Sequence, residues 1–435
     1  MDLELPGLHG SLGSPVIESM NFLNEVAQQY PDALSFAAGR PYEGFFDIGA
    51  VHRYLDRFVA HVRAGAGGDE ARVRRTLLQY GRTKGIIHDL VAKNLRIDEG
   101  IEADPESIVV TVGCQEALFL TLRALRRTER DAVLAVIPCY VGLSGAAELA
   151  DLPVLPVANS ADGIDLDDLV RTVERAKADG LRPRALYVVP DFANPSGISM
   201  PRDTRERLLA LAEEHGFLLL EDNPYGLFHG TAGRPPALKA LDSARQVVYL
   251  GSYAKTGLPG ARIGFVVADQ PVTGAGPESG GRQSLADQLA KIKSMLTVNT
   301  PPLAQAVLGG KLLTHDCDLR AANTREAQVY RDNLRHVLDG LAEHFPPGSS
   351  PEVTWNAPTG GFFVVLTLPF AADDALLALS ARKHKVLWTP LHHFYGDGAA
   401  RRQIRLSFSQ LTPDEIREGL HRLAAFIGEL SAHHP

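Results

Sequence analysis

Short apolar runs rich in β-branched residues alternate with longer amphipathic stretches through the middle of the chain. The runs are apolar on both faces, which is typical of strands buried inside a sheet. They cover residues 107–112, 132–137, 185–190, 217–221, 246–250 and 263–267. Helical patterns lie between them at 115–126, 166–179 and 204–215, and the last ends at Gly216, a common C-cap. The alternation predicts an α/β fold in which helices flank a mostly parallel sheet.

The pattern changes from about residue 321 onward. A long helical pattern at 321–344 precedes a strand region at 360–366, a short strand around Val386 and another strand at 404–408. A last helical pattern covers 413–431. Because strands and helices no longer alternate regularly, this part of the chain predicts a small α+β domain.

The composition and charge argue against some classes of function. A chain of 435 residues with 45% hydrophobic and 22% charged residues is ordinary for a globular protein with a large core. The net charge is −8, and acidic and basic residues are mixed, which argues against a nucleic-acid partner. No apolar run reaches the length of a signal peptide or a membrane span, so we expect no membrane partner and a cytoplasmic location.

The cysteines carry little information. Cys114, Cys139 and Cys317 are too few and too scattered for a disulfide framework or a zinc site. We expect small, partly buried side chains in a reducing compartment, and we expect no metal.

In sheets of this kind, ligands bind at the carboxyl ends of the strands. The first run is followed by Gly113-Cys114-Gln115, which opens a helix and presents free N–H groups suited to a phosphate. Many strand-to-helix turns contain glycine, so this signal is weak alone. The third run is followed by a polar loop that contains Asn194-Pro195 and reads as an ordinary turn in isolation.

Charged residues come after the fourth and fifth runs. Asp222 follows an apolar strand, where a carboxylate is costly to desolvate unless a cation such as a protonated pyridine nitrogen pairs with it. A capping role for Asp222 is the alternative. Lys255 lies in a Gly-rich loop, where desolvation lowers the amine pKa and makes it nucleophilic, as Schiff-base chemistry requires. Arg262, seven residues further on, supplies a charge for a phosphate.

Four motifs occur in a fixed order: Asn194-Pro195, Asp222-x-x-Tyr225, Ser252-x-x-Lys255 and Arg262. Together they resemble the class I/II aminotransferases of the aspartate aminotransferase superfamily, and most closely the kynurenine/2-aminoadipate branch. The likeness extends from residues 35–41 to residues 404–409. It implies a fold type I enzyme that binds pyridoxal 5′-phosphate (PLP), with a mostly parallel, seven-stranded type of sheet and a small α+β domain.

The resemblance also implies a division of the chain. Residues 1–50 would be an N-terminal segment that packs with the small domain and the substrate entrance. Residues 51–320 would form the large PLP-binding domain, and residues 321–435 the small domain. Within the large domain, the Gly- and Pro-rich stretch 270–284 reads as a surface loop.

The resemblance implies roles for the residues that match its motifs. Lys255 would hold PLP as a Schiff base and move the proton between the substrate Cα and the cofactor. Asp222 would pair with the pyridine nitrogen, Asn194 and Tyr225 would hydrogen-bond the ring oxygen, and Tyr140 would stack on the ring.

Two further groups of residues follow from the same resemblance. The phosphate would be held by Gly113, Cys114, Gln115, Ser252, Arg262 and, from a partner subunit, Tyr80. Because Tyr80 would act across an interface, a homodimer is implied. Arg405 would bind the substrate α-carboxylate as a bidentate fork, and Gly39, Arg40 and Asn194 would complete the substrate site.

Some positions depart from the pattern of the branch. Ala254 and Cys114 stand where serine is frequent, so a phosphate hydroxyl is missing at each. The stretch 389–394 replaces a Gly-containing loop near the substrate pocket and adds His392 and His393, which are either close to the chemistry or simply exposed. Arg40 either binds a second acidic group of the substrate or lies at the surface.

These departures concern the substrate more than the cofactor. The expected reaction is amino transfer from an α-amino acid to a 2-oxo acid. The alternative is another PLP reaction, such as β-elimination by a C–S lyase or a decarboxylating or oxidative deamination in a natural-product pathway. A transcription regulator built on this fold is disfavoured, because only about 30 residues precede the motif that begins at Ser35.

Overall fold

The centre of the protein is a seven-stranded sheet with the strand order β2-β8-β7-β6-β5-β3-β4. We describe a computed structural model that covers residues 3–229, 233–274 and 283–433. Strand β8 runs antiparallel to both of its neighbours, and the other neighbouring strands pair in parallel. The strands are β2 (Ile108–Val112), β3 (Asp131–Ile137), β4 (Val154–Ala158), β5 (Arg182–Val188), β6 (Leu218–Asp222), β7 (Val247–Ser252) and β8 (Ile263–Val267).

The six apolar runs are confirmed as strands. The seventh strand, β4, was not predicted from the sequence pattern. It lies at the edge of the sheet, contains Pro156 and has only one buried residue, Val157. An edge strand of this kind has no continuous apolar run, and proline is tolerated there because one side needs no ladder hydrogen bonds.

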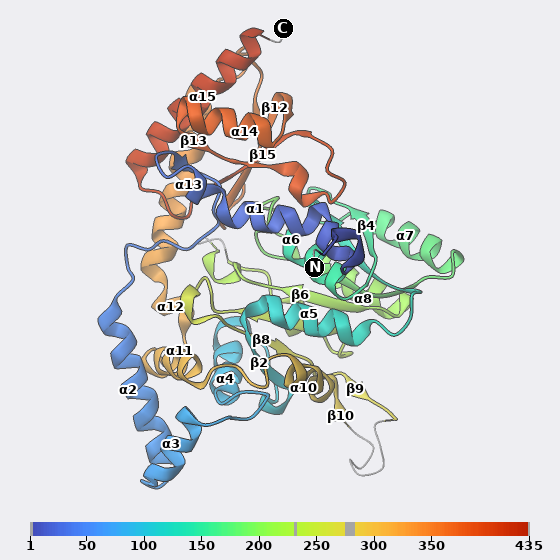
Figure 1. The fold of residues 1–435 in the computed structure, drawn as a ribbon, viewed down its shortest axis with the longest axis vertical. Coiled ribbons are helices and arrows are strands. Elements are labelled where there is room, and N and C mark those ends of the chain that lie inside the picture. The colour runs from blue at the N-terminus through green and yellow to red at the C-terminus, as the bar shows by residue number, and fades with distance from the viewer. Residues whose placement is uncertain (1–2, 230–232, 275–282, 434–435) are drawn as a thin grey trace.

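Helices cover both faces of the sheet (Figure 1). One face packs against α5 (Gly113–Leu125), α6 (Val141–Leu149) and α10 (Leu285–Leu296). The other face packs against two groups of helices. These are α7 (Leu166–Ala178) and α8 (Arg202–His215), then α2 (Ile48–Gly65), α3 (Glu70–Leu78), α4 (His88–Glu99) and α11 (Pro302–Thr314). The side chains of successive strand residues point to opposite faces, so each run buries apolar groups on both.

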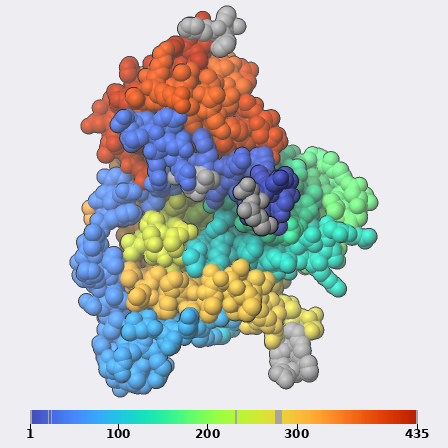
Figure 2. Space-filling model, in the orientation of Figure 1, coloured from blue at the N-terminus to red at the C-terminus, as the bar shows by residue number. Residues whose placement is uncertain are grey.

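The C-terminal part forms its own four-stranded sheet, in the order β11-β12-β15-β14. Figure 2 shows it as the orange and red end of the molecule. The strands are β11 (Thr354–Trp355), β12 (Phe363–Ala372), β14 (Thr389–Pro390) and β15 (Arg401–Ser407). They pack with α13 (Thr324–His344), α14 (Asp374–Leu379) and α15 (Pro413–His433) around one apolar core. The expected order of elements is confirmed, and the division of the chain into domains stays a prediction.

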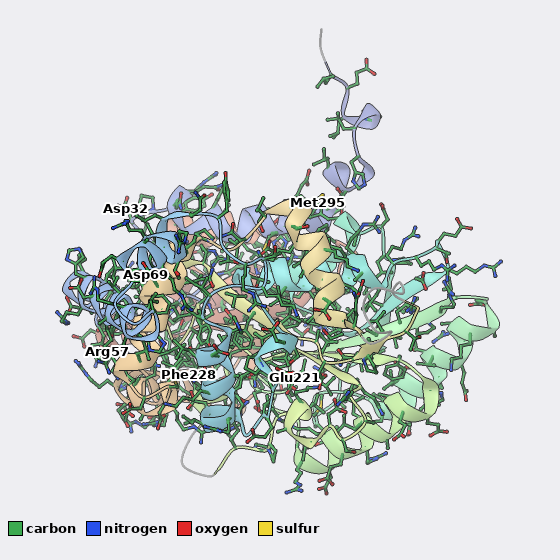
Figure 3. The ribbon with its side chains drawn as sticks, turned by 90° about the horizontal axis from the view of Figure 1, so that it is seen from below. Asp32, Arg57, Asp69, Glu221, Phe228 and Met295 are labelled. Carbon is green, nitrogen blue, oxygen red and sulfur yellow. The ribbon has the colours of Figure 1, made fainter. Side chains whose placement is uncertain are left out.

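The N-terminal segment joins the two parts. Helix α1 (Pro15–Gln29) begins at Ser14, whose side chain caps the helix and also donates to Glu148 of α6 at 2.7 Å. Strand β1 (Leu34–Ser35) then pairs in parallel with β13 (Val386–Leu387) of the C-terminal part. Figure 1 shows α1 between the central sheet and the C-terminal elements. In Figure 3 the segment before α1 projects away from the body of the molecule.

The stretch 270–284 is only partly the loop that its composition predicts. Strand β9 (Pro271–Val272) pairs antiparallel with β10 (Gln283–Ser284), so the two ends of this stretch form a short β-ladder. Residues 275–282 of this stretch lie outside the described residues. Within the part of the chain that is described, no helix is long and apolar enough to cross a membrane.

Candidate active site

A cavity of about 590 Å³ opens at the carboxyl ends of β5, β6 and β7, between the central sheet, α1 and the C-terminal sheet. All of the site residues expected from the sequence line this cavity except Gly113 and Tyr80. They are Gly39, Arg40, Cys114, Gln115, Tyr140, Asn194, Asp222, Tyr225, Ser252, Lys255, Arg262 and Arg405. Strand ends and loops that are far apart in the chain therefore converge on one pocket.

Lys255 reaches into the cavity from the loop after β7. Its Nζ donates to the carbonyl oxygen of Gly39 at 2.6 Å. Burial lowers the pKa of Lys255 to about 8, and the positive charges of Arg405, Arg262 and Arg40 act in the same direction. A substantial fraction of the amine is therefore neutral near pH 8, which is the form that attacks a carbonyl.

Asp222 ends β6 and is almost completely buried. Tyr187 Oη donates to its Oδ2 at 2.6 Å, and Cys114 Sγ lies 3.5 Å from its Oδ1. Burial raises the pKa of Asp222 to about 6, although the contacts with Tyr187 and Cys114 favour the ionised form. Among the described residues, no cationic side chain forms an ion pair with Asp222. The pocket thus holds a carboxylate that lacks a counter-charge.

Sequence reasoning missed Tyr187, which lies inside β5 and lines the cavity. The available signal was a tyrosine within a buried apolar strand, because a buried phenol usually finds a hydrogen-bond partner. The strand register adds the rest of the argument: Tyr187 pairs with Leu220, two residues before Asp222 on the neighbouring strand. Residues two apart on a strand lie on the same face, so the two side chains meet.

The start of α5 approaches Arg262 closely. Gly113 has φ of 74°, and a Cβ there would lie 2.5 Å from Arg262 Nη2. A Cβ on Gly264 would similarly lie 2.4 Å from the backbone nitrogen of Cys114. No side chain caps the first turn of α5. Free amide groups and a guanidinium next to each other form a cradle for an anion.

Tyr140 and Gln115 form the wall beside this cradle. Gln115 Nε2 donates to the carbonyl oxygen of Gly142 at 2.7 Å, and Tyr140 Oη lies 3.5 Å from Gln115 Oε1. On the far side, Tyr225 packs edge-on against Phe363 with ring centroids 5.7 Å apart. Burial raises the pKa of the Tyr225 hydroxyl above its usual range, so this hydroxyl stays a hydrogen-bond donor at neutral pH.

Arg405 enters the cavity from β15. Its Nη1 donates to Asn194 Oδ1 at 2.5 Å, and its Nη2 donates to the carbonyl oxygen of Ala37 at 2.8 Å. The guanidinium lies 4.3 Å from the ring centroid of Phe363 and 4.9 Å from that of Phe394. Burial lowers the pKa of Arg405 to about 10, so it remains charged at neutral pH. The fork is held rigidly and is suited to a carboxylate.

The remaining wall comes from α1 and from the segment before β15. Met20 and Leu23 of α1 line the cavity together with Phe394. Sequence reasoning missed Met20 and Leu23, because nothing local shows that α1 folds back over a sheet formed much later in the chain. Arg40 also lines the cavity, with its side chain largely exposed. Its role, in substrate binding or as a surface residue, stays a prediction.

Besides Gly113, two further expectations concern residues outside the cavity lining. Tyr80 is 81% exposed and does not line the cavity within this chain. His392 and His393 directly precede Phe394 in one short 3₁₀ helix and are not among the lining residues. The idea that they are exposed loop side chains is wrong, because the His393 side chain is only 4% exposed and that of His392 only 11%.

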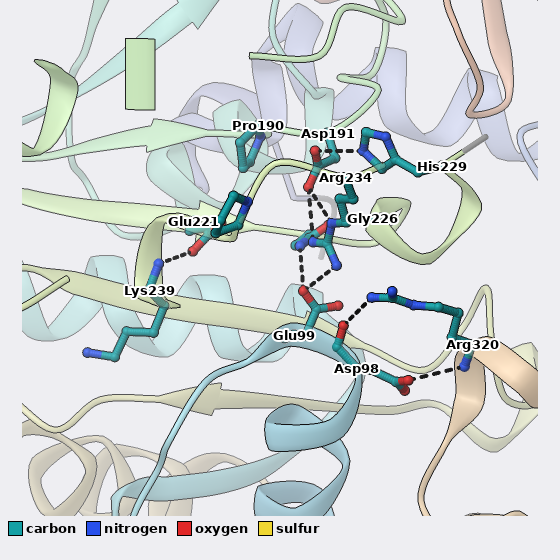
Figure 4. A network of polar contacts seen from close by, with 12 residues as sticks. Asp98, Glu99, Pro190, Asp191, Glu221, Gly226, His229, Arg234, Lys239 and Arg320 are labelled. Atoms are coloured by element: carbon teal, nitrogen blue, oxygen red, sulfur yellow. Dashed lines mark hydrogen bonds and ion pairs between the residues drawn. The ribbon is translucent and has the colours of Figure 1, made fainter. Parts of the chain in front are cut away.

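A second buried polar network lies next to the cavity (Figure 4). Asp191 accepts hydrogen bonds from Arg205, Arg234 and His229 at 2.5–3.2 Å. Arg234 also forms an ion pair with Glu99. Because these carboxylates and cations compensate one another, the network has the composition of a structural brace for the loop after β5.

The residues of the cavity fit PLP. Asp222 lacks a counter-charge that a protonated pyridine nitrogen supplies. The cradle at Gly113 and Arg262 suits a phosphate, and Lys255 has the depressed pKa that a Schiff-base lysine needs. The central sheet with helices on both faces and this donor set define the class: fold type I PLP-dependent enzymes.

The comparisons with known proteins identify the family. The profile described as "Aminotransferase class I and II" matches residues 57–423. A curated relative, "(S)-3,5-dihydroxyphenylglycine transaminase" from Amycolatopsis orientalis, is 56% identical over 98% of this chain and 94% of its own length. The "2-aminoadipate transaminase" of Thermus thermophilus is 31% identical over 93% of this chain and 92% of its own length. The chain belongs to the class I and II aminotransferases.

Solved structures agree with this assignment. The kynurenine aminotransferase of Pyrococcus horikoshii superposes with a TM-score of 0.77 at 27% identity, covering 96% of this chain and 95% of that chain. The α-aminoadipate aminotransferase LysN of Thermus thermophilus, solved with a phosphopyridoxyl adduct, gives 0.75 at 28% identity and covers 96% of this chain and 98% of that chain. The protein is therefore a PLP-dependent aminotransferase, and the expected reaction, amino transfer, is confirmed.

Proposed function

We propose that this aminotransferase acts on an arylglycine, an α-amino acid whose aromatic ring is attached directly to Cα, with (S)-3,5-dihydroxyphenylglycine as the favoured example. A 2-oxo acid accepts the amino group that the arylglycine gives up. The observation that carries the proposal is the 56% identity, over 98% of the chain, to the Amycolatopsis orientalis enzyme of that name. The Thermus thermophilus 2-aminoadipate transaminase is far more distant, at 31%.

The lining of the cavity supports an aromatic substrate. Met20 and Leu23 from α1 and Phe394 supply an apolar wall on the substrate side of Arg405. The ring of an arylglycine begins at Cα, so it must lie close to the group that binds the α-carboxylate. Arg40, at the same cavity, supplies a cationic donor for ring hydroxyl groups. We therefore assign Arg40 and Gly39 to the substrate side of the site.

The cofactor side is assigned from the same geometry. Lys255 Nζ would hold PLP covalently, and Asp222 would pair with its pyridine nitrogen. Asn194 and Tyr225 would hydrogen-bond the ring oxygen, and Tyr140 would stack on the ring. When bound, PLP delocalises the negative charge that develops at Cα as a bond to it breaks.

The phosphate would lie between the start of α5 and the loops around β8. The residues assigned to it are Gly113, Cys114, Gln115, Ser252 and Arg262, with Tyr80 from a partner subunit. Ser252 Oγ accepts a hydrogen bond from the backbone nitrogen of Ala254 at 3.2 Å, which leaves its own proton free to donate. The Cys114 thiol contacts Asp222, so Cys114 would serve the phosphate through its backbone N–H in the first turn of α5.

The chain's own groups then perform the proton transfer. Arg405 binds the substrate α-carboxylate and orients the Cα–H bond toward the lysine side of the pocket. Lys255, with its depressed pKa, would be the base that removes the proton from Cα and the acid that gives it back. An arylglycine has no leaving group next to Cα, so the alternative of β-elimination does not apply to this substrate.

A homodimer belongs to this proposal. Tyr80 is 81% exposed, as a residue that serves a partner's phosphate site would be in a single chain. Other large apolar side chains are also exposed, including Met295 at 84%, Ile48 at 82% and Leu3 at 73%. Figure 3 places Met295 at the surface. Exposed apolar groups in this number support an interface between copies of the chain.

The experiment is a substrate comparison with purified enzyme and one 2-oxo acid acceptor. We expect kcat/KM for (S)-3,5-dihydroxyphenylglycine to exceed that for phenylglycine, which lacks the hydroxyl groups, by at least about tenfold. Arg40→Gln should remove most of this difference, whereas the exposed Arg57→Gln serves as a control and should preserve it. A preference for 2-aminoadipate or for phenylglycine contradicts the substrate assignment. Release of carbon dioxide without amino transfer contradicts the reaction itself.

A further inference from the structure

Three potential metal ligands lie close together outside the lining of the cofactor cavity. His392 and His393 lie in the short 3₁₀ helix Leu391–Phe394, and Asp374 is the first residue of α14. The ligand atoms of the three side chains all lie within 4.8 Å of one another. Sequence spacing does not reveal the group, because 19 residues separate Asp374 from His393.

The distances within the group resemble those around a tetrahedral cation. Asp374 Oδ1 lies 2.8 Å from His393 Nε2 and 3.6 Å from His392 Nε2. Two ligands about 2.0–2.1 Å from a tetrahedral zinc ion are about 3.4 Å apart, so only small side-chain shifts are needed. The contact with His393 is short enough for a hydrogen bond, whereas the 3.6 Å contact of His392 Nε2 is not. The His392 ring has a further partner in the backbone of Ala372, and its Nδ1 has no hydrogen-bond partner among the residues that the structure describes.

A neighbouring residue prepares His393 for ligation. Ser19 Oγ of α1 is 2.7 Å from His393 Nδ1. A partner on Nδ1 orients the imidazole and leaves Nε2 to face a metal, which is the usual arrangement around metal-bound histidine. Both histidine side chains are largely buried, whereas the Asp374 side chain is 46% exposed. The carboxylate side therefore gives a hydrated ion a path to the site and leaves room for a water ligand.

We propose that Asp374, His392 and His393 form a site for a divalent late transition-metal ion, with Zn²⁺ as the favoured ion. Imidazole and carboxylate ligands in a three-residue set suit zinc with a water in the fourth position. The ion would connect α14 with the 3₁₀ helix, and through Ser19 it would tie both to α1. The residue after His393 is Phe394, which packs on Arg405, so the ion would brace the substrate wall.

The test uses the PLP-loaded enzyme after chelator treatment and dialysis, titrated with Co²⁺ in place of zinc. The readouts are visible d–d absorption of the bound ion and calorimetric stoichiometry. We expect one equivalent per chain with a Kd of ~10 µM or tighter. His393→Gln and His392→Gln should each abolish the tetrahedral cobalt spectrum. Asp374→Asn, at an exposed position, should weaken binding at least tenfold, and Ser19→Ala should weaken it by about tenfold.

The control is His421→Gln, which removes a histidine from another close pair. His344 and His421 have ring centroids 5.8 Å apart, and no carboxylate completes a ligand set with them among the described residues. Wild-type binding in His421→Gln supports the proposal. Absence of bound Co²⁺ in the wild type, or unchanged binding in His393→Gln or His392→Gln, overturns it. The contacts of Ser19, His393 and Asp374 are then a structural hydrogen-bond chain only. Retention of the cofactor's absorbance in each variant reports that it is folded.

Discussion

Asp222 ends β6, and Asp191 lies just after the neighbouring parallel strand β5; both are buried, but their surroundings are opposite. Asp191 is surrounded by Arg205, Arg234 and His229 (Figure 4). Burial alone would raise the pKa of Asp191, yet these neighbours hold it below its usual range. Asp222 has only hydroxyl and thiol contacts, and burial raises its pKa to about 6.

The difference shows how a structural carboxylate can be told from a functional one. Burial and position at a strand end are shared, so neither feature separates the two. The absence of a counter-charge at Asp222 does separate the two carboxylates, because a buried ion is tolerated only when other groups compensate its charge. At Asp191 the protein supplies the compensation, whereas at Asp222 a cationic ligand must supply it. The following predictions test this contrast, from the largest expected effect to the smallest.

Asp191→Asn should lower the free energy of unfolding by about 3–5 kcal/mol, because Arg205 and Arg234 would remain buried without their shared counter-charge. Denaturant unfolding measures this loss. The exposed Asp32→Asn, labelled in Figure 3, is the control and should change stability by less than about 0.5 kcal/mol. If Asp191→Asn is as stable as the wild type, the network is not the brace that we describe.

Asp222→Asn should leave the apoenzyme folded and lower kcat by at least about 100-fold, which corresponds to about 3 kcal/mol of transition-state stabilisation. Asparagine is nearly isosteric with aspartate but cannot neutralise the pyridine nitrogen, so the ring becomes a weaker electron sink. Steady-state kinetics with saturating PLP measure the effect. Asp191→Asn is the counterpart: its folded fraction should keep nearly normal kcat. Equal loss of kcat in both variants would remove the distinction.

The apoenzyme should lose stability as the pH rises from about 4 to about 6. Asp222 has a folded-state pKa of about 6 against an ordinary value of 3.8, so the folded apoenzyme binds the extra proton in this window. The difference corresponds to up to about 3 kcal/mol of unfolding free energy. Thermal denaturation of apo wild type and apo Asp222→Asn across this range measures it. This loss of unfolding free energy should be absent in Asp222→Asn. If that variant loses as much stability as the wild type, other titrating groups cause the effect.

Tyr187→Phe should have a smaller effect, lowering kcat by about tenfold. It removes the 2.6 Å hydrogen bond that favours ionised Asp222, and a hydrogen bond to a charged group contributes about 1.5–3 kcal/mol. The matched control is Tyr249→Phe, a buried tyrosine on β7 whose pKa is raised first by burial and then by Glu99 and Glu221. Steady-state kinetics should show normal kcat for Tyr249→Phe. An equal decrease in both variants would indicate a general packing effect.

Much of the fold and the cofactor side of the site could be predicted from sequence. Apolar runs mark buried strands regardless of the rest of the chain; Asp222 directly follows one such run, and Lys255 lies in the loop after another. Edge strand β4 could not be predicted, because Pro156 and its exposed neighbours break the run. No local pattern shows which strand ends meet at the site. The order of the four motifs along the chain indicated it.

The substrate side was less predictable for a physical reason. Met20 and Leu23 reach the cavity because α1 packs against α6 and is tied there by Ser14 and Glu148, 134 residues apart in the chain. No local pattern encodes such a contact. The environment of His393 is another example: it depends on Ser19, which is 374 residues away. Long-range contacts of this kind shape the substrate side of the cavity more than they shape the loops on its cofactor side.

The central claim is that Asp222 lacks a counter-charge in the protein so that it can pair with the pyridine nitrogen of PLP. Reconstitution of the apoenzyme with ¹⁵N-labelled PLP and ¹⁵N NMR at neutral pH tests it most directly. We predict a chemical shift of a protonated ring nitrogen in the wild type and in Asp191→Asn, and of an unprotonated nitrogen in Asp222→Asn. An unprotonated nitrogen in the wild type, or a protonated one in Asp222→Asn, would contradict the account.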